Sequence, residues 1–146
     1  MHSNQSAVVY LVNAGQEMDH HQSLIGRRWE YGVNDCFSLV RDYFALQGVV
    51  LPDFDRPPIL DTCESIFLQQ AEHIGFRQVQ YCRRQPGDVL IMRLGTMAPM
   101  HAAILLPDEQ ILHQRQDSLS AVEPLRKYHV DRIAAVFRYA AGRPTA

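Results

Sequence analysis

The sequence lacks the features of membrane, secreted and nucleic-acid-binding proteins. No apolar run approaches the length needed to cross a bilayer, and the apolar segment at residues 7–12 has neither a basic region before it nor a small-residue cleavage site after it. Charge is nearly balanced at a net −2, and no basic stripe is present. We therefore expect no membrane insertion, no nucleic-acid partner and no signal peptide, and hence a protein that is made in the cytoplasm.

Cysteine is also scarce. The three cysteines, Cys36, Cys63 and Cys82, cannot all pair, and the sequence contains no C-x-x-C motif. Such a count is typical of a reducing compartment and not of a disulfide scaffold. Cys63 and Cys82 are interpreted as structural, whereas the position of Cys36 distinguishes it from both. No pattern in the sequence implies a cofactor.

The length and composition fit one domain over residues 1–146. Hydrophobic residues make up 47% and charged residues 21% of the chain, which is ordinary for a globular protein with a core of its own. No internal repeat or second-domain boundary is visible. Residues 1–15 are weakly patterned, and we expect them to be a flexible lead-in or the boundary of a longer protein.

Helical patterns fill the first half of the sequence and strand patterns the second. The predicted helices cover residues 17–28, 36–47 and a segment that Asp61 or Thr62 caps and that runs to about residue 74. The predicted strands cover residues 76–81, 89–94, 102–106, 110–114 and 132–139. A turn after residue 106 makes two of these strands a hairpin. Helices followed by an antiparallel meander predict an α+β fold, with the N-terminal helices packed on one face of a single sheet.

A cysteine stands where the helix over residues 36–47 begins. Asn34 and Asp35 are good N-cap residues, and Gly48 is a natural end for the helix. A thiol in the first turn of a helix lies near unpaired backbone N–H groups and the positive end of the helix dipole, which favour the thiolate. We therefore interpret Cys36 as a candidate nucleophile for acyl chemistry. The alternative is a small buried hydrophobic residue, which is what most free cysteines are.

Two downstream histidines are candidate partners for Cys36. His101 directly precedes the strand at residues 102–106, where it could take the proton of the thiol as a general base. His113 lies on the next predicted strand, at a natural distance for a hairpin partner, and could fix the tautomer of His101 as the third member of a triad. For both residues, a strand histidine without a catalytic role is the alternative interpretation.

Tyr31 and backbone donors complete the predicted site. Tyr31 lies in the loop before Cys36, where its phenol could help to stabilise an oxyanion or could simply pack. Backbone N–H groups at the start of the helix, including that of Cys36, are the more dependable oxyanion donors. His129 lies in a charged stretch at residues 126–132 and is given no role.

Four segments resemble, in this order, the NlpC-type peptidoglycan-cleaving cysteine peptidases: residues 31–36, 86–92, 100–106 and 111–113. The resemblance spans about residues 29–139, and the branch concerned is the one at the C-terminal end of lambda-type phage tail-tip assembly proteins. It implies a papain-like fold with Cys36 as nucleophile, His101 as base, His113 as the polar third member and Tyr31 near the active site. It also implies that an amide bond in peptidoglycan stem peptides is cut, typically between D-glutamate and a diamino acid.

A phage setting would give the protein other tail-tip proteins as partners, and a place of action in the periplasm or cell wall. Two departures from the family pattern leave room for alternatives. Phe37 and Ser38 follow Asp-Cys where many relatives have Ser-Gly, and neither a metallopeptidase-like domain nor a wall-binding repeat is visible. The alternatives are a peptidoglycan amidase with another scissile bond, a catalytically silent tail-tip structural protein, and a zinc site formed by Cys36, His101 and His113.

Overall fold

The computed structural model describes residues 20–56 and 65–140, and it confirms the α+β prediction. Its helical elements are the 3₁₀ helix η1 (His20–Leu24), α2 (Cys36–Leu46), α3 (Ile66–Gln70), the 3₁₀ helix η2 (Tyr81–Arg83) and α4 (Lys127–Val130). Its strands are β1 (Phe76–Val79), β2 (Val89–Met92), β3 (His101–Leu106), β4 (Gln110–His113), β5 (Ala121–Pro124) and β6 (Ile133–Tyr139). No helix within these ranges has the length and apolar character that a membrane span requires.

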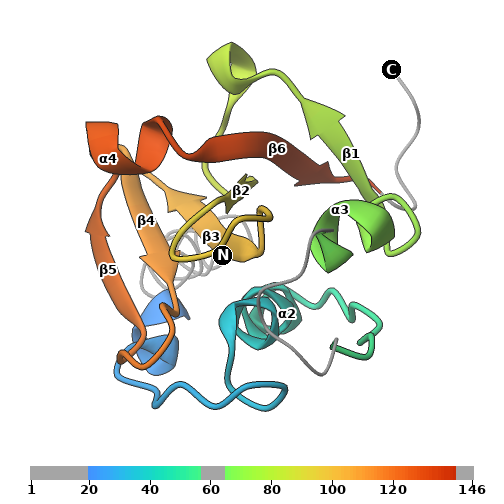
Figure 1. The fold of residues 1–146 in the computed structure, drawn as a ribbon. Helices are drawn as coiled ribbons and strands as arrows, with labels where there is room; N and C mark the ends of the chain where they lie inside the picture. The colour runs from blue at the N-terminus through green and yellow to red at the C-terminus, as the bar shows by residue number, and fades with distance from the viewer. Residues whose placement is uncertain (1–19, 57–64, 141–146) are drawn as a thin grey trace, which may run out of the picture.

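The strands form one antiparallel sheet in the order β1-β6-β2-β3-β4-β5. The last strand of the chain, β6, therefore lies inside the sheet between β1 and β2. Figure 1 shows α2 and α3 on the same side of the sheet, as predicted, and α4 beside the ends of β4 and β5. The predicted hairpin is the β3–β4 pair, whose turn holds Asp108 and Glu109 at positive φ. The sheet thus carries helices on one face and a small helix at one end.

Apolar side chains pack against both faces of the sheet. The larger cluster joins the sheet to α2 and α3, and a smaller cluster lies on the opposite face. β2 contributes Val89 and Ile91 to the first cluster and Leu90 and Met92 to the second. All four side chains are fully buried, which explains why this strand is a continuous apolar run rather than an alternating one.

The predicted helix at residues 36–47 is α2, and its capping prediction is confirmed. The Asp35 side chain accepts a hydrogen bond from the backbone N–H of Ser38, which satisfies one of the donors left open by the first turn. Gly48 follows the C-cap with a φ of +81°, a conformation that glycine adopts at little cost. The helix buries one face against the sheet, and Cys36 is its first residue.

The helix predicted at residues 17–28 is shorter than expected. Residues 17–19 lie outside the described ranges, and the described part is the 3₁₀ helix η1, which ends at Leu24. Gly26 then donates its N–H to the carbonyl of Ser120, and the N–H of Arg27 bonds the Ser120 hydroxyl. These donors serve a distant segment near β5 instead of the preceding helical turn, so the helix does not continue.

The helix predicted from residue 61 or 62 to 74 is also wrong in its extent. The described helix, α3, ends at Gln70 and is followed by turns that lead into β1. Ser65 caps it, accepting from the N–H of Leu68 while donating its own hydroxyl proton to the carbonyl of Pro99 at 2.5 Å. Residues 57–64, among them Cys63 and both predicted caps, lie outside the described ranges.

Two elements between β4 and β6 were not predicted. β5 pairs with β4, and α4 follows it with Arg126 as its N-cap. The five predicted strands are all present, with ends that differ from the prediction by no more than two residues. The pattern missed β5 because its residues are half-buried or exposed and do not alternate clearly.

Two leucines of α2 offer a matched test of this packing. Leu39 is 1% exposed and Leu46 is 42% exposed. Leu39→Ala should lower the free energy of unfolding by about 2–5 kcal/mol, because it leaves a cavity between α2 and the sheet. Leu46→Ala should change it by less than about 1 kcal/mol. Urea unfolding followed by circular dichroism measures both, and equal losses would contradict the described orientation of α2.

Candidate active site

One cleft brings together three of the four predicted site residues. It lies where the start of α2 meets the start of β3, and its lining includes Trp29, Tyr31, Cys36, Arg56, His101 and Gln114. His113, the fourth predicted residue, lies behind His101 and contacts its ring. The two walls come from segments far apart in the sequence, and only the packing of α2 on the sheet makes them neighbours.

Cys36 is partly buried and holds its proton in the resting structure. Its Sγ lies 3.4 Å from the carbonyl oxygen of Met100, to which the thiol donates. Burial raises the pKa of the Cys36 thiol to about 11, and the charge of Asp35 adds to this rise. The backbone N–H groups of Ala102 and Phe37 pull the pKa down by less. The expectation that the helix start favours the thiolate is therefore wrong for the resting state, because burial and the capping carboxylate outweigh the helix.

His101 and His113 are joined through their rings. Nε2 of His101 lies 2.8 Å from Nδ1 of His113, and both side chains are buried. This contact leaves Nδ1 as the nitrogen of His101 that remains for the thiol. Burial lowers the pKa of His101 well below 6.5, and the positive charge that His113, His129 and Arg115 can carry lowers it further. A neutral imidazole with a low pKa can accept a proton near pH 7 but does not hold one at rest.

A further group of side chains extends from His113, and the sequence did not predict it. Nε2 of His113 lies 2.7 Å from Oε1 of Glu123, and Nε2 of His129 lies 3.2 Å from the same oxygen. His129 lies in the charged stretch noted in the sequence, but its side chain is buried and contacts this group. Glu123 could have been found from the β4–β5 pairing, which places it opposite Ile111. Ile111 is two residues from His113 on β4, so Glu123 and His113 lie on the same face of the sheet.

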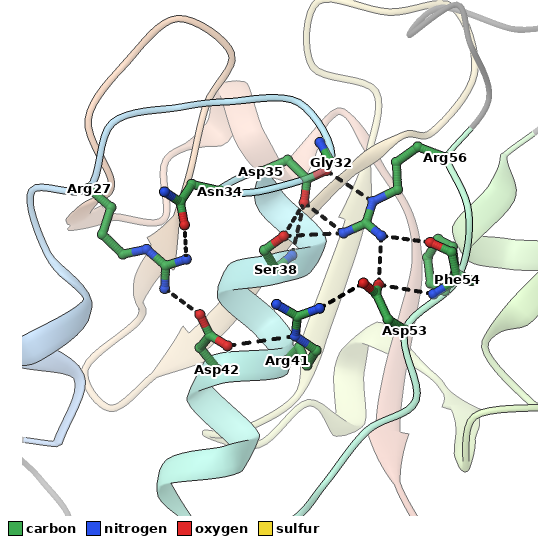
Figure 2. A network of polar contacts seen from close by, with 10 residues as sticks. All are labelled: Arg27, Gly32, Asn34, Asp35, Ser38, Arg41, Asp42, Asp53, Phe54 and Arg56. Carbon is green, nitrogen blue, oxygen red and sulfur yellow. Dashed lines mark hydrogen bonds and ion pairs between the residues drawn. The ribbon is translucent and has the colours of Figure 1, made fainter.

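The start of α2 is held by a buried ion pair (Figure 2). Arg56 donates from Nε and Nη2 to the two oxygens of Asp35, at 3.0 and 3.1 Å, and the two side chains are 9% and 6% exposed. Burial alone would raise the pKa of Asp35, but hydrogen bonds from Arg56 and from the Ser38 N–H lower it overall. The Arg56 guanidinium also lies over the rings of Phe37 and Phe54. Asp35 is therefore a charged cap beside the thiol.

Tyr31 lies on the loop wall of the cleft, next to Trp29. The two rings stack at 20° with their centroids 6.3 Å apart. Burial and the neighbouring charge of Asp35 raise the pKa of the Tyr31 phenol, so the phenol keeps its proton at neutral pH and can donate it in a hydrogen bond. This position is compatible with the predicted role of Tyr31 and does not test it.

The histidine side chains that could hold a metal use their ring nitrogens in hydrogen bonds instead. Among the described residues, His113, Glu123 and His129 offer ligand atoms within 4.8 Å of one another. However, Nδ1 of His129 accepts from the backbone N–H of Arg126 at 3.0 Å, so the neutral ring carries its proton on Nε2 and has no lone pair there for a metal. The zinc alternative through Cys36, His101 and His113 meets a similar difficulty at His113, whose Nδ1 contacts His101 and whose Nε2 contacts Glu123.

Comparisons with known proteins agree on one family. A model of the NlpC/P60 family matches residues 26–138. Tail tip assembly protein K of Escherichia phage lambda is 37% identical over 124 residues, which make up 84% of this chain and 62% of that protein. This chain therefore spans less than two thirds of that relative. A solved structure from Staphylococcus aureus, described as similar to lipoprotein, NLP/P60 family, superposes with a TM-score of 0.59 at 19% identity, covering 86% of this chain and 41% of the other.

Replacing Asp35 by asparagine should make the thiol more acidic. The side-chain oxygen of asparagine can still cap α2, but Asp35→Asn removes the negative charge that raises the pKa of Cys36 and leaves the positive charge of Arg56, which lowers it. The midpoint of Cys36 alkylation against pH should lie above the value of about 8.5 for a free thiol in the wild type and move down in Asp35→Asn. Peptide mass spectrometry follows the reaction at Cys36. A wild-type midpoint below that of a free thiol would contradict a neutral resting pair.

Acid should destabilise the fold through the buried histidines. Burial lowers the pKa of both His101 and His113, so the unfolded chain takes up protons below about pH 6.5 that the folded chain resists. The free energy of unfolding should therefore fall as the pH is lowered from 7.5 to 5.5. Urea unfolding at intermediate pH values measures the slope, which His113→Asn should flatten and His73→Asn, at an exposed turn, should not. A slope of zero in the wild type would contradict the lowered pKa values.

Proposed function

The chain belongs to the NlpC/P60 family, and we propose from this that it is a cysteine peptidase that hydrolyses an amide bond in peptidoglycan stem peptides. The observation that carries the proposal is the cleft itself, in which Cys36 at the start of α2 faces the strand that carries His101. A thiol, an imidazole and a third polar side chain bonded to that imidazole are the parts that acyl transfer through a cysteine requires. Tyr31 and His113 complete the proposed set.

The chemistry begins from a neutral thiol and a neutral imidazole. As Sγ of Cys36 attacks the amide carbonyl, its proton passes to Nδ1 of His101, and the carbonyl oxygen becomes an oxyanion. The backbone N–H of Cys36 and the phenol of Tyr31 stabilise this oxyanion. His101 then returns the proton to the leaving amine, which leaves a thioester on Cys36. Water attacks the thioester with His101 again as base, and the acid product and the thiol are released.

The walls of the cleft bear on which bond is cut. We propose the amide between D-glutamate and a diamino acid, on the basis of the family. Phe37, which follows the nucleophile, packs against Phe54 at a centroid distance of 4.2 Å and under the Arg56 guanidinium. This part of the cleft lining therefore consists of two aromatic rings and a guanidinium that contact one another. Phe37 departs from the residue that many relatives have after the cysteine. A peptidoglycan amidase that cuts a different bond is therefore the alternative.

The name of the lambda relative places that protein in tail tip assembly. We propose that this chain likewise is a phage tail component, with other tail-tip proteins as partners and peptidoglycan in the periplasm or cell wall as its place of action. The same name describes assembly rather than hydrolysis. It thereby favours a second candidate function, in which the fold is kept for contacts within the tail tip and no bond is cut.

Digestion of purified sacculi tests the proposed function. The wild type and Cys82→Ala should release the same muropeptide fragments, and Cys36→Ala should release none above background, a loss of at least about 1000-fold in rate. Cys82 is the matched control because it is an exposed free cysteine in η2, outside the residues that line the cleft. Mass spectrometry of the fragments identifies the bond.

The outcomes separate the candidates. Fragments cut between D-glutamate and the diamino acid support the proposal, and fragments cut elsewhere support the amidase. Equal fragment release by wild type and Cys36→Ala would contradict Cys36 as nucleophile. Loss of activity with a chelator but not with a thiol alkylator would indicate a metal enzyme. A wild type that releases nothing, while folded, would leave the structural tail-tip role.

A further inference from the structure

A continuous chain of polar contacts, three hydrogen bonds and one ion-pair contact between His129 and Glu123, runs from α4 to the cleft. It starts at the backbone N–H of Arg126, passes through His129, Glu123 and His113, and ends at His101, with atom separations of 3.0, 3.2, 2.7 and 2.8 Å. Three of its four side chains are buried, and Glu123 is 32% exposed. In such a chain each neutral imidazole carries one proton on one of its two nitrogens. The N–H of Arg126 at one end therefore determines which nitrogen carries the proton in each ring as far as His101.

The backbone contact of His129 allows only one tautomer of its neutral ring. A backbone N–H can only donate, so Nδ1 of His129, which lies 3.0 Å from the N–H of Arg126, must accept. The ring proton is therefore on Nε2, which lies 3.2 Å from Oε1 of Glu123. His129 at this distance favours the ionised form of Glu123.

Glu123 then determines the tautomer of His113. Burial alone would raise the pKa of Glu123, but His113, Arg115 and His129 lower it overall, so the side chain is a carboxylate that only accepts. His113 must donate from Nε2 to this carboxylate. Burial lowers the pKa of His113 and Glu123 opposes this only in part, so the ring is neutral and its Nδ1 has no proton. Nδ1 of His113 can therefore only accept.

The same reasoning determines the tautomer of His101, which lines the cleft together with Cys36. Its Nε2 must carry the ring proton, because Nδ1 of His113 at 2.8 Å can only accept. We infer that Glu123 and His129 are positioning residues that hold His101 in the Nε2–H tautomer and so leave its Nδ1 unprotonated toward Cys36. This inference deepens the proposed function, on which its role in catalysis rests. The proton positions themselves do not depend on which bond, if any, is cut.

The carboxylate has a second effect once the thiol proton has moved. His101 then carries a positive charge, and its Nε2–H still donates to Nδ1 of His113. The ring of His113 separates Glu123 from His101. The negative charge of Glu123 stabilises the positive charge on the hydrogen-bonded rings of His101 and His113. Arg115, which follows β4 and lowers the pKa of both rings, acts against it. Glu123 therefore favours proton uptake by His101 during the reaction while leaving it neutral at rest.

Nitrogen-15 spectra of the histidine rings test the proton positions directly, without substrate. The protein is labelled on histidine, and long-range ¹⁵N–¹H correlations are assigned by single-histidine substitutions. Wild type at pH 7.5 should show the Nε2–H tautomer for His101, His113 and His129. Glu123→Gln should shift His113 and His101 toward Nδ1–H, because the new amide can donate to Nε2 of His113. Glu123→Asp keeps an acceptor-only carboxylate and should keep the wild-type tautomers.

Kinetics on a stem-peptide substrate test the catalytic consequence. Glu123→Gln should lower kcat about 10- to 1000-fold with KM changed less than about threefold, and should move the acid limb of the pH profile to lower pH. Glu123→Asp should restore much of the loss. Glu109→Gln is the matched control, since it removes the same charge from a surface pair with Arg84 at the β3–β4 turn. It should leave tautomers, kcat and pH profile unchanged.

Three results would overturn the inference. A wild-type His101 with its proton on Nδ1 contradicts the chain even if Glu123→Gln does not fold. Unchanged tautomers and pH profile in a folded Glu123→Gln contradict the role of Glu123. Ring signals that change when a chelator is added to the wild type indicate a metal at His113, Glu123 and His129 instead. Wild-type tautomers as predicted, in a protein that cuts no peptidoglycan, contradict the proposed function alone.

Discussion

The buried carboxylate of Asp35 is the interaction on which the candidate site depends. It accepts from the backbone N–H groups of Gly32 and Ser38 and from Arg56, so one side chain joins the loop that precedes α2, the first turn of α2 and the segment that follows it. These bonds fix where Cys36 stands. They also put a negative charge beside the thiol, which raises its pKa and keeps the proton on sulfur at rest. Asp35 therefore holds Cys36 in position and at the same time makes its thiol a weaker acid.

The opposite wall of the cleft compensates for this arrangement. A thiol with a raised pKa needs a base that is unprotonated and correctly oriented at the moment of attack. Burial keeps His101 neutral, and the contact with His113 commits its Nε2, so that Nδ1 remains. The two halves are consistent with the proposed function: a capping carboxylate disfavours a preformed ion pair, and a neutral histidine can accept the proton in the proposed attack.

Much of the fold could be predicted because its signals are local. The cap and length of α2, the β3–β4 hairpin and the buried run of β2 follow from neighbouring residues. The two other predicted helices were too long. The first ends early because Gly26 bonds to Ser120, which is distant in sequence, and the second ends at Gln70. β5 and α4 gave no clear periodicity, and with them Glu123 and His129 were missed.

By itself, the sequence determined the α+β class, the family resemblance and three candidates that line one cleft, Tyr31, Cys36 and His101, with His113 behind them. These follow from residue type, local pattern and order along the chain. Only the tertiary structure decided the charge state of the thiol and the ring nitrogen that His101 offers to it. Both depend on burial and on partners brought together by folding, Arg56 beside Asp35 and Glu123 beside His113. Electrostatic effects of this kind are set by distance in space rather than in sequence.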